Sequence, residues 1–264
     1  MNIFKKKFVL SYLFFFVITY TICGGTLYSQ TNRIQVVYTD WYPYTYMDNE
    51  EPLGFEIEIV NAVMKKMNIT PEFLKYPWRR CLLNLEEGTA DALVSLLKTP
   101  EREKYIFFSN SYISLSKTVL FTKTEKNIQF KGNYQALKGY SIGVIAGFTY
   151  GDAFDKADYL TKDYAQTPQM LIEKLINDRH DLAAENQVVI SGYAAKMGLR
   201  DKIRFLEPPI HTQKLYVGFS KAKGLKKLSD EFSKALDKFK LSEEYVVILK
   251  KYGVNPSDMI EKIE

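Results

Sequence analysis

The chain has 264 residues, of which 46% are hydrophobic and 25% are charged, so a disordered or low-complexity protein is excluded. This length exceeds what one hydrophobic core usually organises, and it predicts two compact lobes. The formal charge of +5 includes Lys5, Lys6 and Lys7, and it falls to +2 once residues 1–29 are removed. So small a positive charge predicts no nucleic-acid partner.

The N-terminal residues have the pattern of a signal peptide, because three lysines precede an apolar run that ends near Ile22. This run is shorter than the roughly 20 residues that a membrane-spanning helix needs. We therefore expect residues 1–29 to be a cleavable signal peptide, cut after Ser29 or Gly25, and the mature protein to lie in the periplasm. Lipid attachment at Cys23 is the less favoured alternative, because Ile22 stands where a small residue is normally required.

Cysteine and histidine usage argues against a catalytic or metal site. Only Cys81 remains after cleavage, so no intramolecular disulfide can form, and no motif links this thiol to His180 or His211. The sequence also lacks a phosphate-binding glycine loop, paired metal ligands and a nucleophile elbow. We expect Cys81 to be a packed thiol, and we expect no catalytic residue, metal or cofactor.

The first part of the body alternates between strand and helix patterns. Apolar residues recur at helical spacing from Ile59 to Met67, and Gly88 is placed to end a helix that begins at Trp78. The order predicts a βαβαβ unit with a parallel sheet. Its expected elements are strands at 33–39, 73–76 and 92–94 and helices around 59–67 and 78–87.

The pattern then restarts as a second α/β unit. Thr167 can cap a helix that has Pro168 at its first position and a buried stripe at Leu171, Ile172 and Leu175. The other expected elements are strands at 117–122, 141–145, 158–164, 181–184 and 213–219, a helix at 148–154, and C-terminal helices that begin near 225 and at 242.

Two α/β units joined by two extended runs predict that the chain crosses between the lobes twice. The expected fold class is α/β, with two lobes and a hinged cleft between them. The predicted boundaries are 30–119 for the first part of lobe 1, 120–214 for lobe 2, and 215–264 for the return segment and C-terminal helices of lobe 1.

Two clusters stand where open α/β sheets place ligands, after the carboxyl ends of strands. Asp40, Trp41 and Tyr44 follow the first strand. The rings of Trp41 and Tyr44 are candidates to sandwich a ligand or to fill the lobe surface. Ser95, Thr99 and Arg102 surround the end of a later strand. A guanidinium pairs bidentately with a carboxylate, so Arg102 is the leading ligand contact, with an ordinary surface arginine as the alternative.

These stretches resemble the bacterial extracellular solute-binding proteins, family 3, of polar amino-acid ABC transport systems. The resemblance covers about residues 33–255, and its matching stretches are Thr39-Asp40 with Pro43-Tyr44, Gly54-Phe55-Glu56-Ile57-Glu58, Gly88 with Asp91-Ala92, and Thr99-Pro100-Glu101-Arg102.

The resemblance implies that Arg102 holds a ligand carboxylate and that Asp40 lies near a cationic end. It also implies contacts from Gly147 and Thr149 in a turn of the second lobe. Asn186 stands where many members have the aspartate that binds the ligand ammonium, and neutral Asn186 cannot replace that charge. Adjacent Glu185 should point away if this region is an extended strand, because neighbouring side chains alternate faces.

A further departure concerns the start of the helix at Trp78, which should face the cleft. Arg79 or Arg80 is placed to hold a second acidic group, and Leu96-Leu97 replaces the usual serine-rich stretch. We therefore predict a ligand with more negative charge than a neutral amino acid. Better binding of lysine or arginine than of glutamate would contradict this hypothesis.

The predicted function is capture of a small carboxylate-bearing polar solute by a monomer that delivers it to a membrane permease. The alternatives are an enzyme of the cyclohexadienyl dehydratase type, with Glu185 as general acid, and a ligand-sensing module for a separate receptor. The predicted ligand-binding residues are Asp40, Trp41, Tyr44, Trp78, Arg79, Ser95, Thr99, Arg102, Gly147, Thr149 and Asn186.

Overall fold

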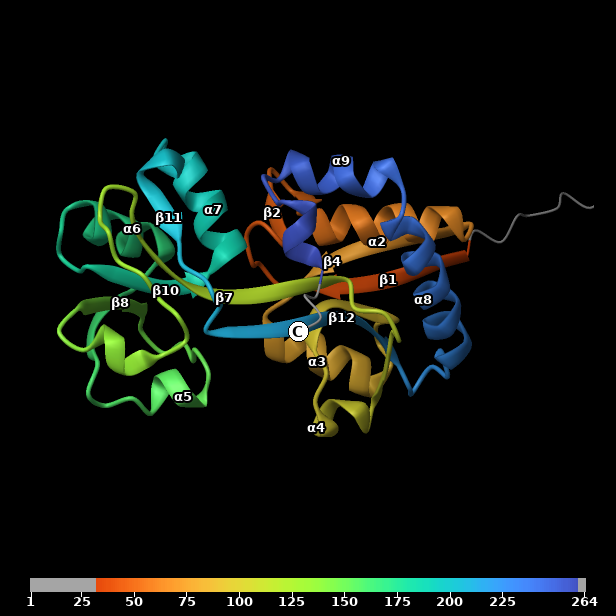
Figure 1. Cartoon of the computed structure of the whole chain (residues 1–264). Helices are drawn as coiled ribbons and strands as arrows, with labels where there is room; N and C mark the ends of the chain where they lie inside the picture. Colours follow the sequence, from red (N-terminus) through yellow and green to blue (C-terminus); the bar gives the residue numbers. More distant parts are fainter. Residues whose placement is uncertain (1–31, 261–264) are drawn as a thin grey trace, which may run out of the picture. The chain divides into compact units, whose positions relative to one another are not determined.

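The computed structural model describes residues 32–260, whose strands and helices form two lobes connected by the long strands β7 and β12 (Figure 1). The strands follow the order β4-β1-β5-β12-β7-β10-β8-β9 in one sheet, with β6 beside β12 and β11 beside β7. The predicted signal peptide lies outside the described residues. No helix within residues 32–260 is both long and apolar enough to cross a membrane.

The first lobe is built on a parallel pair of strands that is covered on both faces. Val36 of β1 is opposite Ala92 of β5, and these residues face a core that α2, α8 and α9 complete. The alternate residues Val37 and Leu93 face α3. The elements are β1 (Asn32–Tyr38), β2 (Tyr46–Asp48), β3 (Glu51–Leu53), α2 (Phe55–Lys66), β4 (Ile69–Lys75), α3 (Trp78–Glu87), β5 (Ala92–Leu97), α4 (Pro100–Glu103), β6 (Ile106–Phe108), α8 (Lys226–Lys240), α9 (Glu243–Lys251) and the 3-10 turn η3 (Pro256–Met259).

The second lobe repeats the arrangement around β10, β8 and β9, which run parallel to one another. The side chain of Thr167 accepts a hydrogen bond of 3.2 Å from the backbone N–H of Met170 and caps α6, as the sequence predicted. The elements are η1 (Tyr134–Leu137), β8 (Ser141–Ile145), α5 (Asp152–Asp155), β9 (Thr161–Ala165), α6 (Pro168–Ile176), β10 (Leu182–Asn186), α7 (Gln187–Lys196), η2 (Arg200–Lys202) and β11 (Ile203–Phe205).

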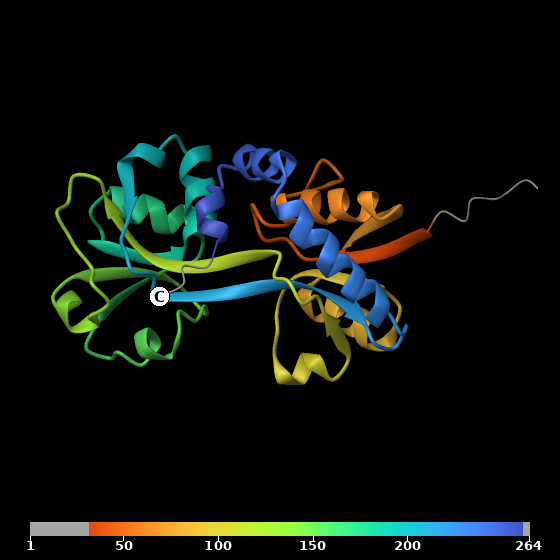
Figure 2. The ribbon, with the colours of Figure 1, turned by 45° about the vertical axis from the view of Figure 1, so that its right-hand side comes forward.

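The two predicted crossings are strands β7 (Ser114–Lys123) and β12 (His211–Ser220), which pair with each other over His211–Leu215. Beyond that stretch β12 pairs with β5 and β6 of the first lobe. Strand β7 pairs with β10 and β11 of the second lobe from Thr118 onward. Both strands run from one lobe to the other in two views (Figures 1 and 2).

Two differences from the sequence predictions lie in the second lobe. The predicted helix at 148–154 is wrong for its first half, because Gly147 adopts φ 79° and the chain turns before the short helix α5 begins. Helix α7 was not predicted at all. Its start packs against the first-lobe core through Val188 and Val189, whereas Ile190 and Ala194 face a second-lobe core, so its apolar residues form no single stripe.

Candidate functional site

A cavity of about 430 Å³ is lined by both lobes and by the strands that connect them. It lies at the carboxyl ends of β1, β5 and β10, where an open α/β sheet is expected to bind a ligand. We call it the ligand cavity. Its lining residues are Thr39, Asp40, Trp41, Thr45, Trp78, Ser95, Leu97, Arg102, Ser116, Thr118, Phe148, Thr149, Glu185, Asn186, Gln213 and Leu215.

Arg102 enters the ligand cavity from the first lobe in a fixed orientation. Its Nη1 donates a hydrogen bond of 2.8 Å to the carbonyl of Leu97, and its guanidinium lies 5.0 Å from the centre of the Trp78 ring. The backbone N–H of Arg102 donates to Thr99 Oγ1 at 3.4 Å, so Thr99 caps the short helix that carries the arginine. The remaining guanidinium N–H groups are suited to a carboxylate.

Trp41 forms a rigid aromatic wall, because its ring stacks on Tyr44 with centroids 4.2 Å apart and planes 9° from parallel. Tyr44 is fully buried and donates a hydrogen bond of 3.1 Å to the carbonyl of Leu115. Burial raises the pKa of the Tyr44 hydroxyl, which therefore stays neutral. Tyr44 thus supports Trp41 from behind and is not among the lining residues.

Asn186 lines the cavity, but its amide group is fully used within the protein. Its Oδ1 accepts hydrogen bonds from the backbone N–H groups of Val188 and Val189, at 2.9 and 3.0 Å, and so caps α7. Its Nδ2 donates to Ser116 Oγ at 2.9 Å and to the Tyr44 hydroxyl at 3.1 Å. An amide has two donors and two acceptor lone pairs, so Asn186 has no polar capacity left for a ligand.

Glu185 lines the same cavity, which corrects the expectation that it would point away. Strict alternation does not hold at the end of β10, where Asn186 is both the last strand residue and the N-cap of α7. Glu185 Oε1 accepts a hydrogen bond of 2.8 Å from the backbone N–H of Asn186, and Oε2 accepts one of 3.4 Å from the Tyr150 hydroxyl. Burial raises the pKa of Glu185 to about 7, so this carboxyl group changes charge easily near neutral pH.

Ser95 of β5 lines the ligand cavity. Its Oγ is buried without a hydrogen-bond partner among residues 32–260, and its backbone has the uncommon φ of 66°. The Ser95 hydroxyl acts on the buried carboxyl group of Glu56, whose pKa it lowers against the larger raising effect of burial.

The structure brings most of the predicted binding residues to one cavity. Asp40, Trp41, Trp78, Ser95, Arg102, Thr149 and Asn186 all line it. Thr99 and Tyr44 stand behind lining residues. Gly147 is exposed in the turn next to Phe148, and Arg79 and Arg80 are exposed on α3, outside the lining. The position of these two arginines gives no support to a second site for an acidic group.

A second cavity of about 360 Å³ adjoins the first, because Asp40, Trp41, Phe148 and Glu185 line both. Its other lining residues are Tyr42, Tyr46, Met47, Pro168, Val189, Tyr193 and Lys196. We call it the tyrosine pocket. Sequence reasoning missed Tyr193 and Lys196, because they belong to helix α7, which it did not predict.

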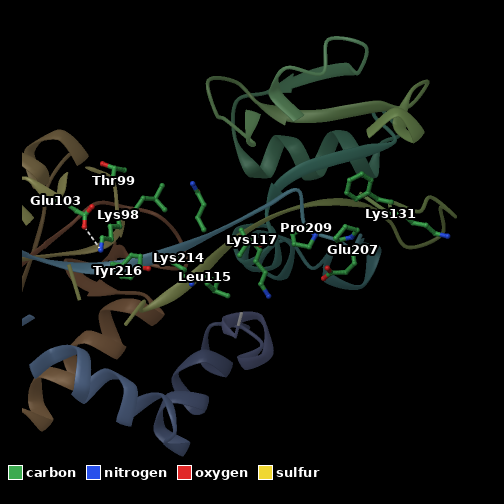
Figure 3. Close-up of a pocket in the computed structure, with 15 residues that line it drawn as sticks. Lys98, Thr99, Glu103, Leu115, Lys117, Lys131, Glu207, Pro209, Lys214 and Tyr216 are labelled. Carbon is green, nitrogen blue, oxygen red and sulfur yellow. Dashed lines mark ion pairs between the residues drawn. The ribbon is translucent and has the colours of Figure 1, made fainter. Parts of the chain in front are cut away.

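A larger hollow, a broad groove of about 1230 Å³, runs along the connecting strands (Figure 3). It shares Leu97 and Gln213 with the ligand cavity, but Arg102, Trp41 and Glu185 do not line it. Among its lysines, Lys98 pairs with Glu103 at 2.9 Å. Fixed polar groups converge in the ligand cavity instead, so we place the candidate site there.

Comparisons with known proteins indicate a family of binding proteins. The family model for bacterial extracellular solute-binding proteins, family 3, matches residues 34–255. The arginine-binding extracellular protein ArtP of Bacillus subtilis (strain 168) is 25% identical over 66% of this chain and 69% of its own length. The histidine-binding periplasmic protein of Escherichia coli (strain K12) is 26% identical over 69% of this chain and 70% of its own. These relatives are binding proteins and do not favour the dehydratase alternative.

Solved structures share the fold. An ancestral cationic amino acid solute binding protein superposes with a TM-score of 0.71 at 20% identity, over 84% of this chain and 95% of the other. The match extends over both lobes, in agreement with the α/β architecture expected from the sequence.

Proposed function

The chain belongs to the bacterial extracellular solute-binding proteins, family 3, and we propose that it captures an amino acid or a related carboxylate-bearing solute for an ABC-type permease. The orientation of Arg102 is the observation that carries this proposal. A guanidinium held by the Leu97 carbonyl and the Trp78 ring still offers a planar pair of donors to the cavity. It loses little freedom when it binds a carboxylate, which favours affinity.

Glu185 is the partner that we assign to the ligand ammonium. The amide of Asn186 is used up by α7, Ser116 and Tyr44, whereas the carboxylate of Glu185 retains acceptor capacity. An ammonium group that approaches Glu185 favours its ionised form, so binding compensates for the burial that disfavours the charge. Arg102 and Glu185 together suit a zwitterion.

Release to a permease requires the lobes to move apart, and β7 and β12 are the segments about which that motion is proposed to occur. Their paired stretch, His211–Leu215 with Ser114–Thr118, borders the ligand cavity through Ser116, Thr118 and Gln213. Ligand contacts on both lobes stabilise the form in which the lobes approach each other. We propose that the protein performs this role as a periplasmic monomer and has no enzymatic activity.

Isothermal titration calorimetry of the protein that lacks residues 1–29 tests the proposal. The panel contains the common amino acids, dicarboxylates and prephenate. We expect at least one amino acid to bind, and we expect the corresponding amino alcohol, which lacks the carboxylate, not to bind. Binding of no carboxylate compound, or equal binding of the amino alcohol, would refute the assignment. Turnover of prephenate would support the dehydratase alternative instead.

A further inference from the structure

The tyrosine pocket extends the ligand cavity with an unusual density of aromatic rings. Tyr42 meets Tyr46 edge to face at 5.0 Å between centroids and tilts against Tyr193 at 5.2 Å. Trp41 and Phe148 line the boundary that the two cavities share. Aromatic faces carry negative potential, so a group of rings around one cavity attracts a cation.

The chain itself places a cation in this pocket. The Nζ of Lys196 lies 3.5 Å from the centre of the Tyr42 ring and 5.8 Å from that of Tyr46. Within residues 32–260, Lys196 forms no ion pair with a carboxylate. The tyrosine rings are therefore its principal electrostatic partners.

Helix α7 allows this arrangement through a glycine. Gly192 stands one helical turn before Lys196, and a Cβ built on it would lie 2.7 Å from Cε1 of Tyr42. No side chain therefore fits at this position without displacing the ring. The ring of Tyr42 lies directly against the helix, within reach of the lysine of the next turn.

Carboxylates stand only at the end of the pocket that joins the ligand cavity. Asp40 accepts hydrogen bonds from the backbone N–H of Met47 at 3.1 Å and from Lys75 Nζ at 3.0 Å, and its side chain is about half exposed. Glu185 is the other acidic group of the lining. A ligand whose α-carbon lies between Arg102 and Glu185 can direct its side chain past these groups toward Tyr42.

We propose that the tyrosine pocket is the subsite for a cationic end group of the ligand side chain, and that Lys196 determines specificity by competing for the same aromatic faces. This inference rests on the proposed function, because it presupposes an amino acid in the ligand cavity. The ammonium of Lys196 marks the place that a guanidinium or ammonium end group takes. Lys196 is long and attached at the exposed last turn of α7, so it can withdraw into solvent when the ligand enters.

Competition makes a specific prediction about charge. When Lys196 is replaced by Met, the pocket loses its own cation but keeps a side chain of similar length. A cationic ligand then gains free aromatic faces and loses a like-charge neighbour. A neutral ligand of the same length gains neither benefit.

Arginine and citrulline form the deciding pair, because they share length and shape and differ in the charge of the end group. We expect wild-type protein to bind arginine at least about 5-fold more tightly than citrulline, the range that one partly exposed cation–π contact supplies. Lys196→Met should raise that ratio by a further factor of about 5, and Tyr42→Leu should lower it toward 1. Lys66→Met is the matched control, because Lys66 Nζ lies 5.6 Å from the Phe239 ring, whose residue lines neither cavity.

Calorimetry of the four proteins with both ligands gives the test, with circular dichroism to establish that each variant is folded. A ratio near 1 in wild type, or a ratio that Lys196→Met leaves unchanged or lowers, overturns the subsite. If other amino acids bind in an Arg102-dependent manner in that case, the proposed function stands and only the subsite fails. If no amino acid binds at all, the proposed function fails with it.

Discussion

Arg102 and Glu185 face one cavity from opposite lobes, but they carry charge in different ways. Arg102 is permanently charged and is fixed by the Leu97 carbonyl and the Trp78 ring. Glu185 is buried, and the pKa of its carboxyl group lies at about 7, so its charge depends on pH and on the ligand. The first lobe thus presents a fixed positive charge, whereas the second presents a carboxyl group whose negative charge the proposed ligand ammonium would stabilise.

The largest expected effect on ligand affinity follows from removing the fixed charge of Arg102. Arg102→Ala leaves a ligand carboxylate without its partner in the cavity, a loss that costs about 2 to 5 kcal/mol at buried charge pairs. We expect the dissociation constant of the amino acid that binds best to rise by about 100-fold or more, as measured by calorimetry. Arg200→Ala is the matched control, because Arg200 lies 5.3 Å from the Phe205 ring and lines neither cavity. A loss below about 3-fold in Arg102→Ala contradicts the assignment.

Removing the carboxyl group of Glu185 should weaken ligand binding less than Arg102→Ala does, and by an amount that depends on pH. Below pH 7 wild-type Glu185 is protonated, so the ligand must displace a proton, and affinity should fall by up to about 10-fold per pH unit. Above pH 7 it should level off. The groups hydrogen-bonded to this carboxyl are the Tyr150 hydroxyl and the Asn186 N–H, and the charged residues that line the tyrosine pocket with it are Asp40 and Lys196. Glu185→Gln should weaken binding by about 10-fold at pH 8 and flatten the profile between pH 5.5 and 8.

An unchanged pH profile in Glu185→Gln shows that another group titrates. The pH dependence of the free energy of unfolding of the unliganded protein checks the raised pKa of Glu185 independently. It has the opposite sign to that of binding, because stability should fall as pH rises whereas affinity should increase. Burial raises the pKa of both Glu185 and Glu56 to about 7. Between about pH 4.5 and 7 the folded protein therefore retains protons that the unfolded chain has lost, and stability falls as pH rises. Denaturant unfolding of wild type and Glu185→Gln at pH 5 and 8 measures this.

The difference between the two lobes also explains what the sequence could predict. Asp40, Trp41, Ser95 and Arg102 follow strand ends in a repeating βα pattern, and the carboxyl ends of parallel strands meet at one edge of the sheet. Local pattern therefore sufficed to locate the first-lobe wall. The helix at Trp78–Glu87 was predicted to the residue, because Gly88 ends it with a φ of 71°.

The second-lobe wall depends on the place where a strand becomes a helix, and a pattern of alternation cannot indicate that place. Glu185 and Asn186 stand at the junction of β10 and α7, and both line the cavity. Helix α7 was missed because it is buried against both lobes. The tyrosine pocket joins residues about 150 positions apart in sequence, such as Tyr42 and Lys196, and only tertiary structure brings them together.

Substitutions of Asn186 test whether this residue stabilises the fold without contributing to ligand binding. Asn186→Ala removes the cap of α7 and should reduce the free energy of unfolding by about 1 to 2 kcal/mol, the usual contribution of an N-cap. Denaturant titration measures this loss. Asn186→Ser, which retains a capping oxygen, should recover part of it. We expect ligand affinity at 10 °C to change by less than about 3-fold in the folded variants, and a loss as large as that of Arg102→Ala contradicts a purely structural role.

The smallest expected effect concerns the support of Arg102 in the first lobe. Thr99 Oγ1 accepts a long hydrogen bond of 3.4 Å from the Arg102 N–H, in a helix of only four residues. Thr99→Ala should therefore weaken ligand binding by only about 2- to 5-fold, the effect of one modest capping bond, and Thr99→Ser should bind as wild type does. Calorimetry resolves this difference. Because the Leu97 carbonyl and the Trp78 ring still hold the guanidinium, a loss approaching that of Arg102→Ala would mean that the hydroxyl of Thr99 contacts the ligand itself.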